Sequence, residues 1–490
     1  MSSNASPGST PPVASAPKRA RVIPITEVVS DDGELYAARK KIQPRSIKGR
    51  FNNLRWAMVW ITQLVFYGLA WLPWHGRQAV LFNLVERKFY IFGLVLWPQD
   101  VVFLSLLLII SALGLFLVTA VAGRVWCGYA CPQSVYTEMF MWIERRIEGD
   151  RSARMKLDAA PMSMRKLGLR TAKHGAWATL ALWTGFTFVG YFSPIRELAA
   201  EVAAWSAGSW EVFWMLFYAA FTYVFAGHMR EQVCKYMCPY ARFQGVMFDP
   251  DSLIVSYDAT RGEPRGSRRK GQEGKAIGDC VDCEWCVQVC PTGIDIRKGL
   301  QYECIGCALC IDACDQVMDK LGRPRGLIAY STERAQLAGK PAHESWREVV
   351  THIVRPRIIL YTSLLAFIVS GFAWALLTRT PVKMNIMRDR ASLAREVEGG
   401  KIENVYQLRI MNTSELPRRF VLDIEGLPGA IIAGEREIEV EAAGSRDVAM
   451  RVQVDAESLT PGSHAMYFNL QAMDAPDVRI HEKASFMQPR

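Results

Sequence analysis

Long apolar runs, separated by polar and basic segments, occupy the first 380 residues of the chain. Five of these runs are long and apolar enough for a helix to cross a bilayer. They cover residues 56–74, 101–122, 174–192, 210–226 and 358–377. A sixth apolar run, 80–97, carries Glu86, Arg87 and Lys88 near its centre. Because charges inside a span are costly, we expect this run to form an interfacial or re-entrant loop.

The pattern changes after about residue 382, where apolar and polar residues alternate. The segments VYQLRI, RRFVLDIE and RDVAMRVQV show this alternation, and GLPG, AAGS and TPGS lie between such segments. Alternation with period two and regular turns is typical of an antiparallel β-sandwich of immunoglobulin-like type. His464 and His481 are too isolated in this region to indicate a metal site. We expect the sandwich to dock a partner protein.

The formal net charge of +10 is distributed unevenly. Arg and Lys concentrate in the N-terminal arm and in residues 123–173 and 230–357, whereas residues 193–209 contain one basic residue, Arg196. Basic loops stay on the cytoplasmic side of a membrane, so the N-terminus and both basic segments are expected in the cytoplasm and the residues after 377 outside it. Nucleic-acid binding is the alternative explanation, but the charges follow the expected spans.

All twelve cysteines lie between Cys127 and Cys314, in segments expected to face the cytoplasm, which favours metal or redox chemistry over structural disulfides. Eight of them form two runs of C-x2-C-x2-C-x3-C. In this pattern the fourth cysteine of each run ligates the other cluster of a two-cluster ferredoxin. Cys280, Cys283, Cys286 and Cys314 are therefore expected to hold one [4Fe-4S] cluster, and Cys304, Cys307, Cys310 and Cys290 the second. Two zinc sites are the alternative, but zinc sites usually pair two C-x2-C units across a longer gap.

The other four cysteines form two C-x3-C-P motifs, WCGYACP with Cys127 and Cys131, and CKYMCP with Cys234 and Cys238. Residues four apart share one face of a helix, and the prolines that follow would end or redirect it. Both motifs are expected at the same membrane boundary, so the four thiols could converge on Cu(I), zinc or an iron–sulfur cluster. A reversible disulfide and inert buried thiols stay open as alternatives. Met237 and His228 are candidate auxiliary ligands, although packing or capping is their more usual role.

Taken together, WCGYACPQSVYTE, CKYMCPYARFQ, the run ending in CPTGIDIR, the ERKFYIFGL segment and the C-terminal domain resemble the cytochrome c oxidase accessory proteins known as CcoG, FixG or RdxA. The resemblance implies a bacterial inner-membrane protein that reduces Cu(II) to Cu(I) during assembly of a cbb(3)-type oxidase. It also implies that Cys127, Cys131, Cys234 and Cys238 are the catalytic, copper-handling thiols. The two C-x3-C-P motifs alone are similar to those of membrane polyferredoxins of nitrate reduction as well.

The expected fold class is a multi-span α-helical membrane protein with a cytoplasmic dicluster ferredoxin-like module and a C-terminal immunoglobulin-like sandwich. Five segments follow from this. They are a disordered cytoplasmic arm at 1–50, a four-helix membrane region at 51–245, the [4Fe-4S] domain at 246–345, a fifth membrane helix at 346–380 and a periplasmic domain at 381–490.

The expected cofactors are two [4Fe-4S] clusters and copper. The expected partners are membrane lipid, a cytoplasmic or quinol electron donor, and the oxidase or its copper-delivery factors, with no nucleic acid; a homodimer stays open. The chain has no P-loop or Rossmann glycine fingerprint, so direct use of ATP or NAD(P)H is not expected. Two alternatives stay open: a relay that passes electrons to another membrane complex, and a redox-sensing assembly scaffold.

Overall fold

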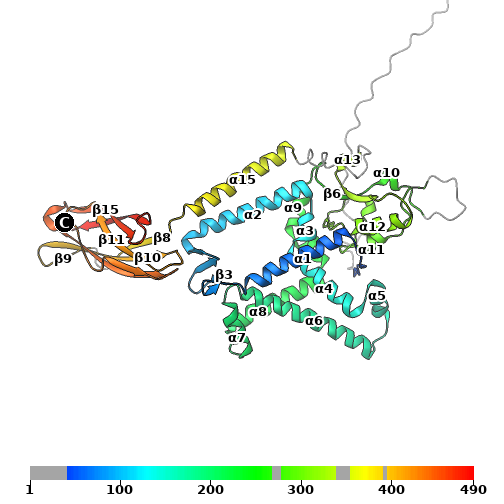
Figure 1. Cartoon of the computed structure of the whole chain (residues 1–490), viewed down its shortest axis with the longest axis horizontal. Coiled ribbons are helices and arrows are strands. Elements are labelled where there is room, and N and C mark those ends of the chain that lie inside the picture. The colour runs from blue at the N-terminus through cyan, green and yellow to red at the C-terminus, as the bar shows by residue number, and fades with distance from the viewer. Residues whose placement is uncertain (1–40, 267–276, 338–353, 390–393, 490) are drawn as a thin grey trace, which may run out of the picture. The chain divides into compact units, whose positions relative to one another are not determined.

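The computed structural model describes residues 41–266, 277–337, 354–389 and 394–489. A helix occupies most of each of the five predicted spans (Figure 1). They are α1 (Arg50–Leu69), α2 (Val101–Ala122), α6 (Met164–Val189), α8 (Ser209–Thr222), which continues as π-helical turns over Tyr223–Met229, and α15 (Pro356–Leu377). The predicted arm 1–50 falls mostly on residues outside the described ranges.

Three of these helices are long and apolar enough to cross a membrane, judged over the described residues. They cover Pro98–Ala122, Ser209–Met229 and Pro356–Leu377, with mean hydropathies of 3.0, 1.4 and 2.0. The chain is therefore a membrane protein, while crossing by α1 and α6 stays a prediction. The first predicted span was drawn too long, because α1 ends at Leu69 and residues Pro73–Trp74 form strand β1.

The membrane helices pack in pairs that use small or aromatic residues. Gly185 of α6 lies so close to α8 that an added Cβ would be 2.3 Å from the Met215 carbonyl oxygen. This close approach explains why a residue without a side chain occupies that position. Phe103 of α2 and Phe372 of α15 meet with ring centroids 5.9 Å apart.

The charged run 80–97, predicted to be an interfacial or re-entrant loop, forms a small antiparallel sheet, and its position at the membrane interface stays a prediction. Its strands are β3 (Val80–Asn83), β4 (Lys88–Ile91) and β5 (Leu94–Leu96). The charges follow from this fold, because Glu86 and Arg87 lie in the exposed turn between β3 and β4. The buried face of this sheet packs on Met411 of the C-terminal region through Leu81, Tyr90, Val95 and Trp97. Two short strands, β1 and β2 (Arg77–Gln78), precede this sheet and pair with each other.

The C-terminal region is the predicted two-sheet sandwich, drawn in orange and red in Figure 1. One sheet has the order β12-β14-β10-β8, with β9 also paired to β10, and the other the order β13-β11-β15-β16. The strands are β8 (Val382–Arg388), β9 (Arg395–Val397), β10 (Lys401–Asn412), β11 (Arg418–Glu425), β12 (Ile431–Ala433), β13 (Glu437–Val440), β14 (Ser445–Asp455), β15 (Gly462–Ala472) and β16 (Arg479–Gln488). Alternate residues of these strands fill a core that includes Tyr406, Phe420, Phe468 and Phe486.

The remaining elements connect the long helices or build the cysteine-rich region. After α2 come α3 (Val125–Tyr129), α4 (Pro132–Glu148) and α5 (Arg151–Ala159), and α7 (Ile195–Ala203) lies between α6 and α8. The π-helical segment Val233–Met237 leads into α9 (Pro239–Met247). The cysteine-rich region then contains β6 (Ile254–Tyr257), α10 (Ala259–Gly262), α11 (Trp285–Gln288), α12 (Leu309–Lys320), β7 (Ile328–Ser331) and α13 (Glu333–Leu337). Strands β6 and β7 pair antiparallel and close this region.

Candidate functional site

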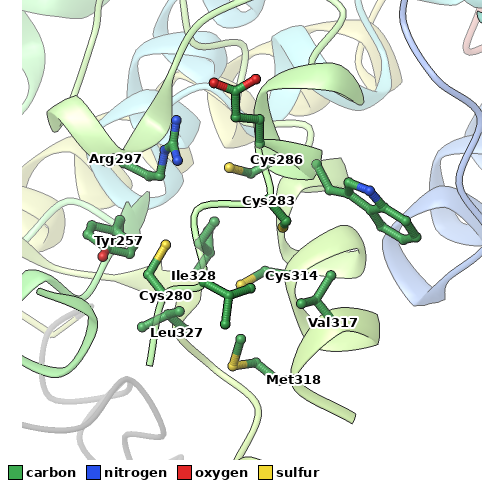
Figure 2. Close-up of a pocket in the computed structure, with 13 residues that line it drawn as sticks. Tyr257, Cys280, Cys283, Cys286, Arg297, Cys314, Val317, Met318, Leu327 and Ile328 are labelled. Atoms are coloured by element: carbon green, nitrogen blue, oxygen red, sulfur yellow. The ribbon is translucent and has the colours of Figure 1, made fainter. Parts of the chain in front are cut away.

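The eight regularly spaced cysteines line two neighbouring cavities. The first contains Cys280, Cys283, Cys286 and Cys314 in its wall (Figure 2). The wall of the second contains Cys290, Cys304, Cys307 and Cys310. Cys286 also borders the second cavity, so the two spaces are adjacent. Each predicted set of four cysteines therefore lines one cavity, and Cys286 lies where the two cavities meet.

Local backbone geometry wraps the chain around these cavities. Asp282 and Glu284, which flank Cys283, have φ angles of 54° and 57°, and Ala308 before α12 has 59°. Such left-handed residues reverse the chain sharply and are uncommon outside functional loops. The short helix α11 carries Cys290 away from Cys283, and the second turn of α12 brings Cys314 to the first cavity. The fourth cysteine of each run therefore changes cavity.

The lining of both cavities fits an iron–sulfur cluster. Four cysteines line the first cavity and five line the second, whose other walls are largely apolar side chains such as Val255, Ile294 and Ile296. Sulfur ligands in an apolar pocket are the donor set that [4Fe-4S] clusters require. Burial raises the pKa of Cys304 and Cys314 to about 12 and that of Cys307 to about 11. Without metal these thiols hold their protons at neutral pH, so loading a cluster releases protons.

The two C-x3-C-P motifs lie just after the ends of α2 and of the π-helical turns that follow α8. Cys127 is in α3, and Cys234 is in the π-helical segment Val233–Met237. Neither motif lies on one continuous helix, so its two cysteines do not share a helix face, and the chain is redirected at the prolines as predicted. Cys131 and Cys238 have extended ψ angles of 127° and 110°, and each precedes a proline that begins the next helix. A proline disfavours helical geometry in the residue before it, which explains both breaks.

The four thiols of these motifs nevertheless lie within electrostatic range of one another. Burial raises the pKa of Cys127 to about 11, and the charges of Cys131 and Cys238 add to the rise. Burial likewise raises the pKa of Cys234 to about 12, and the other three thiols contribute in the same direction. The Cys127 Sγ also lies 3.4 Å from the Gln244 Oε1. Across the described residues, no three Cys, His, Asp or Glu side chains come close enough together to hold a single metal ion.

The proposed auxiliary ligands have other surroundings. His228 packs against the rings of His174, Tyr223 and Trp177, with centroid distances of 5.8, 5.3 and 6.0 Å. Packing is therefore the role that its contacts support. Met237 is about half exposed.

A direct contact joins the first C-x3-C-P motif to the second cavity, and sequence reasoning missed it. Gly128 follows Cys127, and a Cβ added to Gly128 would lie 2.9 Å from the Cys307 Cα and 2.9 Å from the Ile305 carbonyl oxygen. The Tyr129 hydroxyl donates to the Cys307 carbonyl oxygen at 3.3 Å. Cys127 itself packs on the apolar cluster that includes Ile305 and Cys307. The glycine between the two cysteines of WCGYAC is the sequence signal for this close approach.

Comparison with known proteins identifies the chain. Residues 229–333 match the 4Fe-4S dicluster domain, residues 104–149 match a 4Fe-4S binding domain, and residues 372–489 match the immunoglobulin-like fold at the C-terminus of FixG. Nitrogen fixation protein FixG of Rhizobium meliloti is 42% identical over 434 residues, a match that covers 82% of this chain and 83% of FixG. The chain belongs to the FixG family.

Two further proteins of the family, both from Cereibacter sphaeroides, also match over most of the chain. Protein RdxA is 41% identical over 434 residues, covering 86% of this chain and 90% of RdxA. Protein RdxB is 37% identical over 476 residues, covering 94% of this chain and 99% of RdxB. These matches confirm the resemblance drawn from the cysteine motifs. This FixG-family chain is a membrane iron–sulfur protein of the electron-transport class.

Proposed function

We propose that this FixG-family protein is a cupric reductase that reduces Cu(II) to Cu(I) at the membrane boundary during assembly of a cbb(3)-type oxidase. The observation that carries the proposal is the contact of Gly128 with Cys307, which puts the Cys127 motif against the wall of the second cavity. Soft thiol ligands favour Cu(I) over Cu(II), so reduction is downhill where such ligands bind the product.

The cavity linings support the ligand assignment made from the spacing. Cys280, Cys283, Cys286 and Cys314 would hold one cluster, and Cys290, Cys304, Cys307 and Cys310 the other. When bound, the two [4Fe-4S] clusters supply one electron each, and one electron converts one Cu(II) to Cu(I). Cys127, Cys131, Cys234 and Cys238 would receive the copper substrate as thiolates, after release of their protons.

The exposure of the cysteines favours a direction for the electrons. Cys283 is exposed, whereas Cys307 is buried beside the C-x3-C-P motifs. Electrons would therefore enter at the first cavity, from a reductant in the cytoplasm rather than from quinol in the lipid. This orientation requires the basic segments to lie on the cytoplasmic side and the C-terminal sandwich on the periplasmic side, as the positive charges predict.

The test is anaerobic reduction of Cu(II) by the purified full chain, followed with a Cu(I)-specific chelator. We expect Cys127→Ala and Cys234→Ala to lower the rate at least tenfold while the cluster spectra are retained. Gly114→Ala is a control within α2, because a Cβ there meets no atom within 4 Å. Undiminished rates in both cysteine variants would reject the assigned copper site.

A second candidate is an electron relay in which the four C-x3-C-P cysteines hold a third iron–sulfur cluster instead of copper. The match of residues 104–149 to a 4Fe-4S binding domain favours it, because that range contains Cys127 and Cys131. Iron analysis of anaerobically purified protein separates the two. The reductase requires eight irons per chain from two four-iron clusters, whereas a third four-iron cluster requires twelve.

A further inference from the structure

Arg124, between α2 and α3, is a buried cation that forms no ion pair with a carboxylate among the described residues. Only 6% of the residue's surface is exposed to solvent. The guanidinium donates to the carbonyl oxygens of Tyr302 and Ala241, and it lies 3.4 Å from that of Cys304. Its Nε atom is buried without a hydrogen-bond partner. Within the described residues no ion pair joins Arg124 to an Asp or Glu oxygen within 4.0 Å.

Such a charge is costly to bury unless an anion compensates it. Arg124 lines a small space together with Cys304, and Cys127 follows it by three residues in α3. Cys304 lines the second cavity, whereas Cys127 belongs to the first C-x3-C-P motif. Burial lowers the pKa of Arg124, and the charges of Cys127, Cys304 and Cys234, followed by that of Glu303, oppose this effect.

Arg124 also contacts both halves of the site through the backbone. The carbonyls of Tyr302 and Cys304 belong to the loop that carries ligands of the second cavity, and the Ala241 carbonyl belongs to α9, which follows Cys238. Arg124 lines a further small space beside Cys304 together with Gly306 and Tyr330. Its charge thus lies between the two sets of thiols.

We propose that Arg124 is the shared counter-cation of the second cluster and of the C-x3-C-P thiolates, and that its charge raises the reduction potential of the second cluster. A nearby positive charge stabilises the more negative, reduced form of a cluster. Arg124 is a positioning residue in this role, since it acts through the cysteines. The proposal rests on the proposed function in assigning the cluster ligands, but it does not depend on copper being the electron acceptor.

The experiment is an EPR-monitored redox titration of the full chain with Arg124→Gln and Arg124→Lys. Glutamine removes the charge and keeps hydrogen-bonding capacity, whereas lysine keeps the charge and loses the planar fork of donors. We expect Arg124→Gln to lower the reduction potential of the second cluster by about 59 mV, which corresponds to a tenfold change in the equilibrium constant of a one-electron reduction. Arg124→Lys is expected to stay near the wild-type value, and the first cluster should not change in either variant.

Arg325→Gln is the matched control, because Arg325 is exposed and paired with Asp319 at 2.7 Å. It removes the same charge from the surface and should leave the potential of the second cluster unchanged.

If Arg124→Gln does not retain iron, the potential of the second cluster in Arg124→Lys is the test. A lowered potential in Arg124→Lys would contradict the proposal, because it would show that donor geometry matters and charge does not. An unchanged potential in Arg124→Gln, or an equal fall in both variants, overturns the proposal. Failure of wild-type protein to reduce Cu(II) would reject the proposed function and leave this result standing.

Discussion

Gly128 and Cys307 are packed so tightly that a Cβ on the glycine would lie 2.9 Å from the cysteine Cα. Real Cβ atoms do not approach a backbone atom this closely, so any larger residue must displace one of the two segments. Gly128 lies in α3 beside Cys127, and Cys307 lies in the wall of the second cavity. The contact therefore sets how closely the Cys127 motif approaches this cavity, which is the distance that an electron crosses in the proposed reduction.

Gly128→Ala is therefore expected to slow copper reduction without removing either cluster. Displacing the loop lengthens the distance to Cys127, and close positioning of reacting groups accounts for much of the rate in such sites. We expect a fall of about tenfold in single-turnover rate at unchanged iron content. Gly114→Ala, which meets no neighbour within 4 Å, should retain the wild-type rate. A wild-type rate in Gly128→Ala would show that this contact does not limit transfer.

The exchange of the fourth cysteines between the two runs makes a distinct prediction. Cys290 follows Cys286 in sequence but lines the cavity of Cys304 and Cys307. Cys290→Ala should therefore remove the same EPR signal as Cys307→Ala, and the double variant should lose nothing more. If each run held its own cluster, Cys290→Ala would instead behave like Cys283→Ala.

A buried ion-pair network next to the site should account for a measurable part of the stability. Glu144 pairs with Arg230 at 2.9 Å, with Arg154 at 3.0 Å and with Lys173 at 3.8 Å, and its side chain is buried. Glu144→Gln leaves these cations without their carboxylate, which typically costs about 3–5 kcal/mol. Thermal unfolding in detergent measures the loss. Glu435→Gln, in an exposed pair with Arg446, should cost less than about 1 kcal/mol.

The same network predicts a dependence on acid. Burial would raise the pKa of Glu144, but Arg230, Arg154 and Lys173 lower it below the usual value. A carboxylate with a lowered folded pKa stabilises the protein above its unfolded pKa of about 4.3 and loses this effect as the pH falls through the folded value. The stability difference between wild type and Glu144→Gln should thus be constant near pH 7 and shrink below about pH 4. A difference that grew with acid would contradict this assignment.

The C-terminal sandwich is expected to serve assembly rather than electron transfer. Its core is built from residues between Val382 and Phe486, and it contains no cysteine. Removing residues 382–490 should leave iron content and copper reduction in detergent unchanged while oxidase assembly in cells falls. Full assembly by the truncated chain would remove the proposed docking to the oxidase or to a copper chaperone.

Much of the architecture follows from local sequence patterns. Apolar runs predicted where the long helices lie, period-two alternation predicted the sandwich, and the prolines after Cys131 and Cys238 predicted the breaks after both C-x3-C-P motifs. The cysteine spacing assigned two ligand sets, and each set lines one cavity, although Cys286 lines both. The runs 56–74 and 80–97 were less well predicted. Trp74 pairs with Arg77 in a local turn that ends the first run early, whereas the packing of the second run on Met411 depends on tertiary structure.

The relations that matter most for function could not be predicted from spacing. Gly128 and Cys307 are far apart in sequence, and so are Arg124 and Cys304, so their contacts exist only once the dicluster region is docked on the membrane helices. An arginine or a glycine near a cysteine in the sequence can have many ordinary structural roles. Burial, an unpartnered Nε and a 2.9 Å approach are what distinguish these two residues.

Rapid mixing of anaerobically pre-reduced protein with Cu(II), followed by EPR, tests the central claim most directly. We predict that the reduced-cluster signals and the Cu(II) signal disappear together, with one Cu(II) lost for each electron released, and that Cys127→Ala and Cys234→Ala slow both decays equally. Clusters that stay reduced while Cu(II) persists, or that are oxidised by Cu(II) as fast in both variants as in wild type, would contradict it.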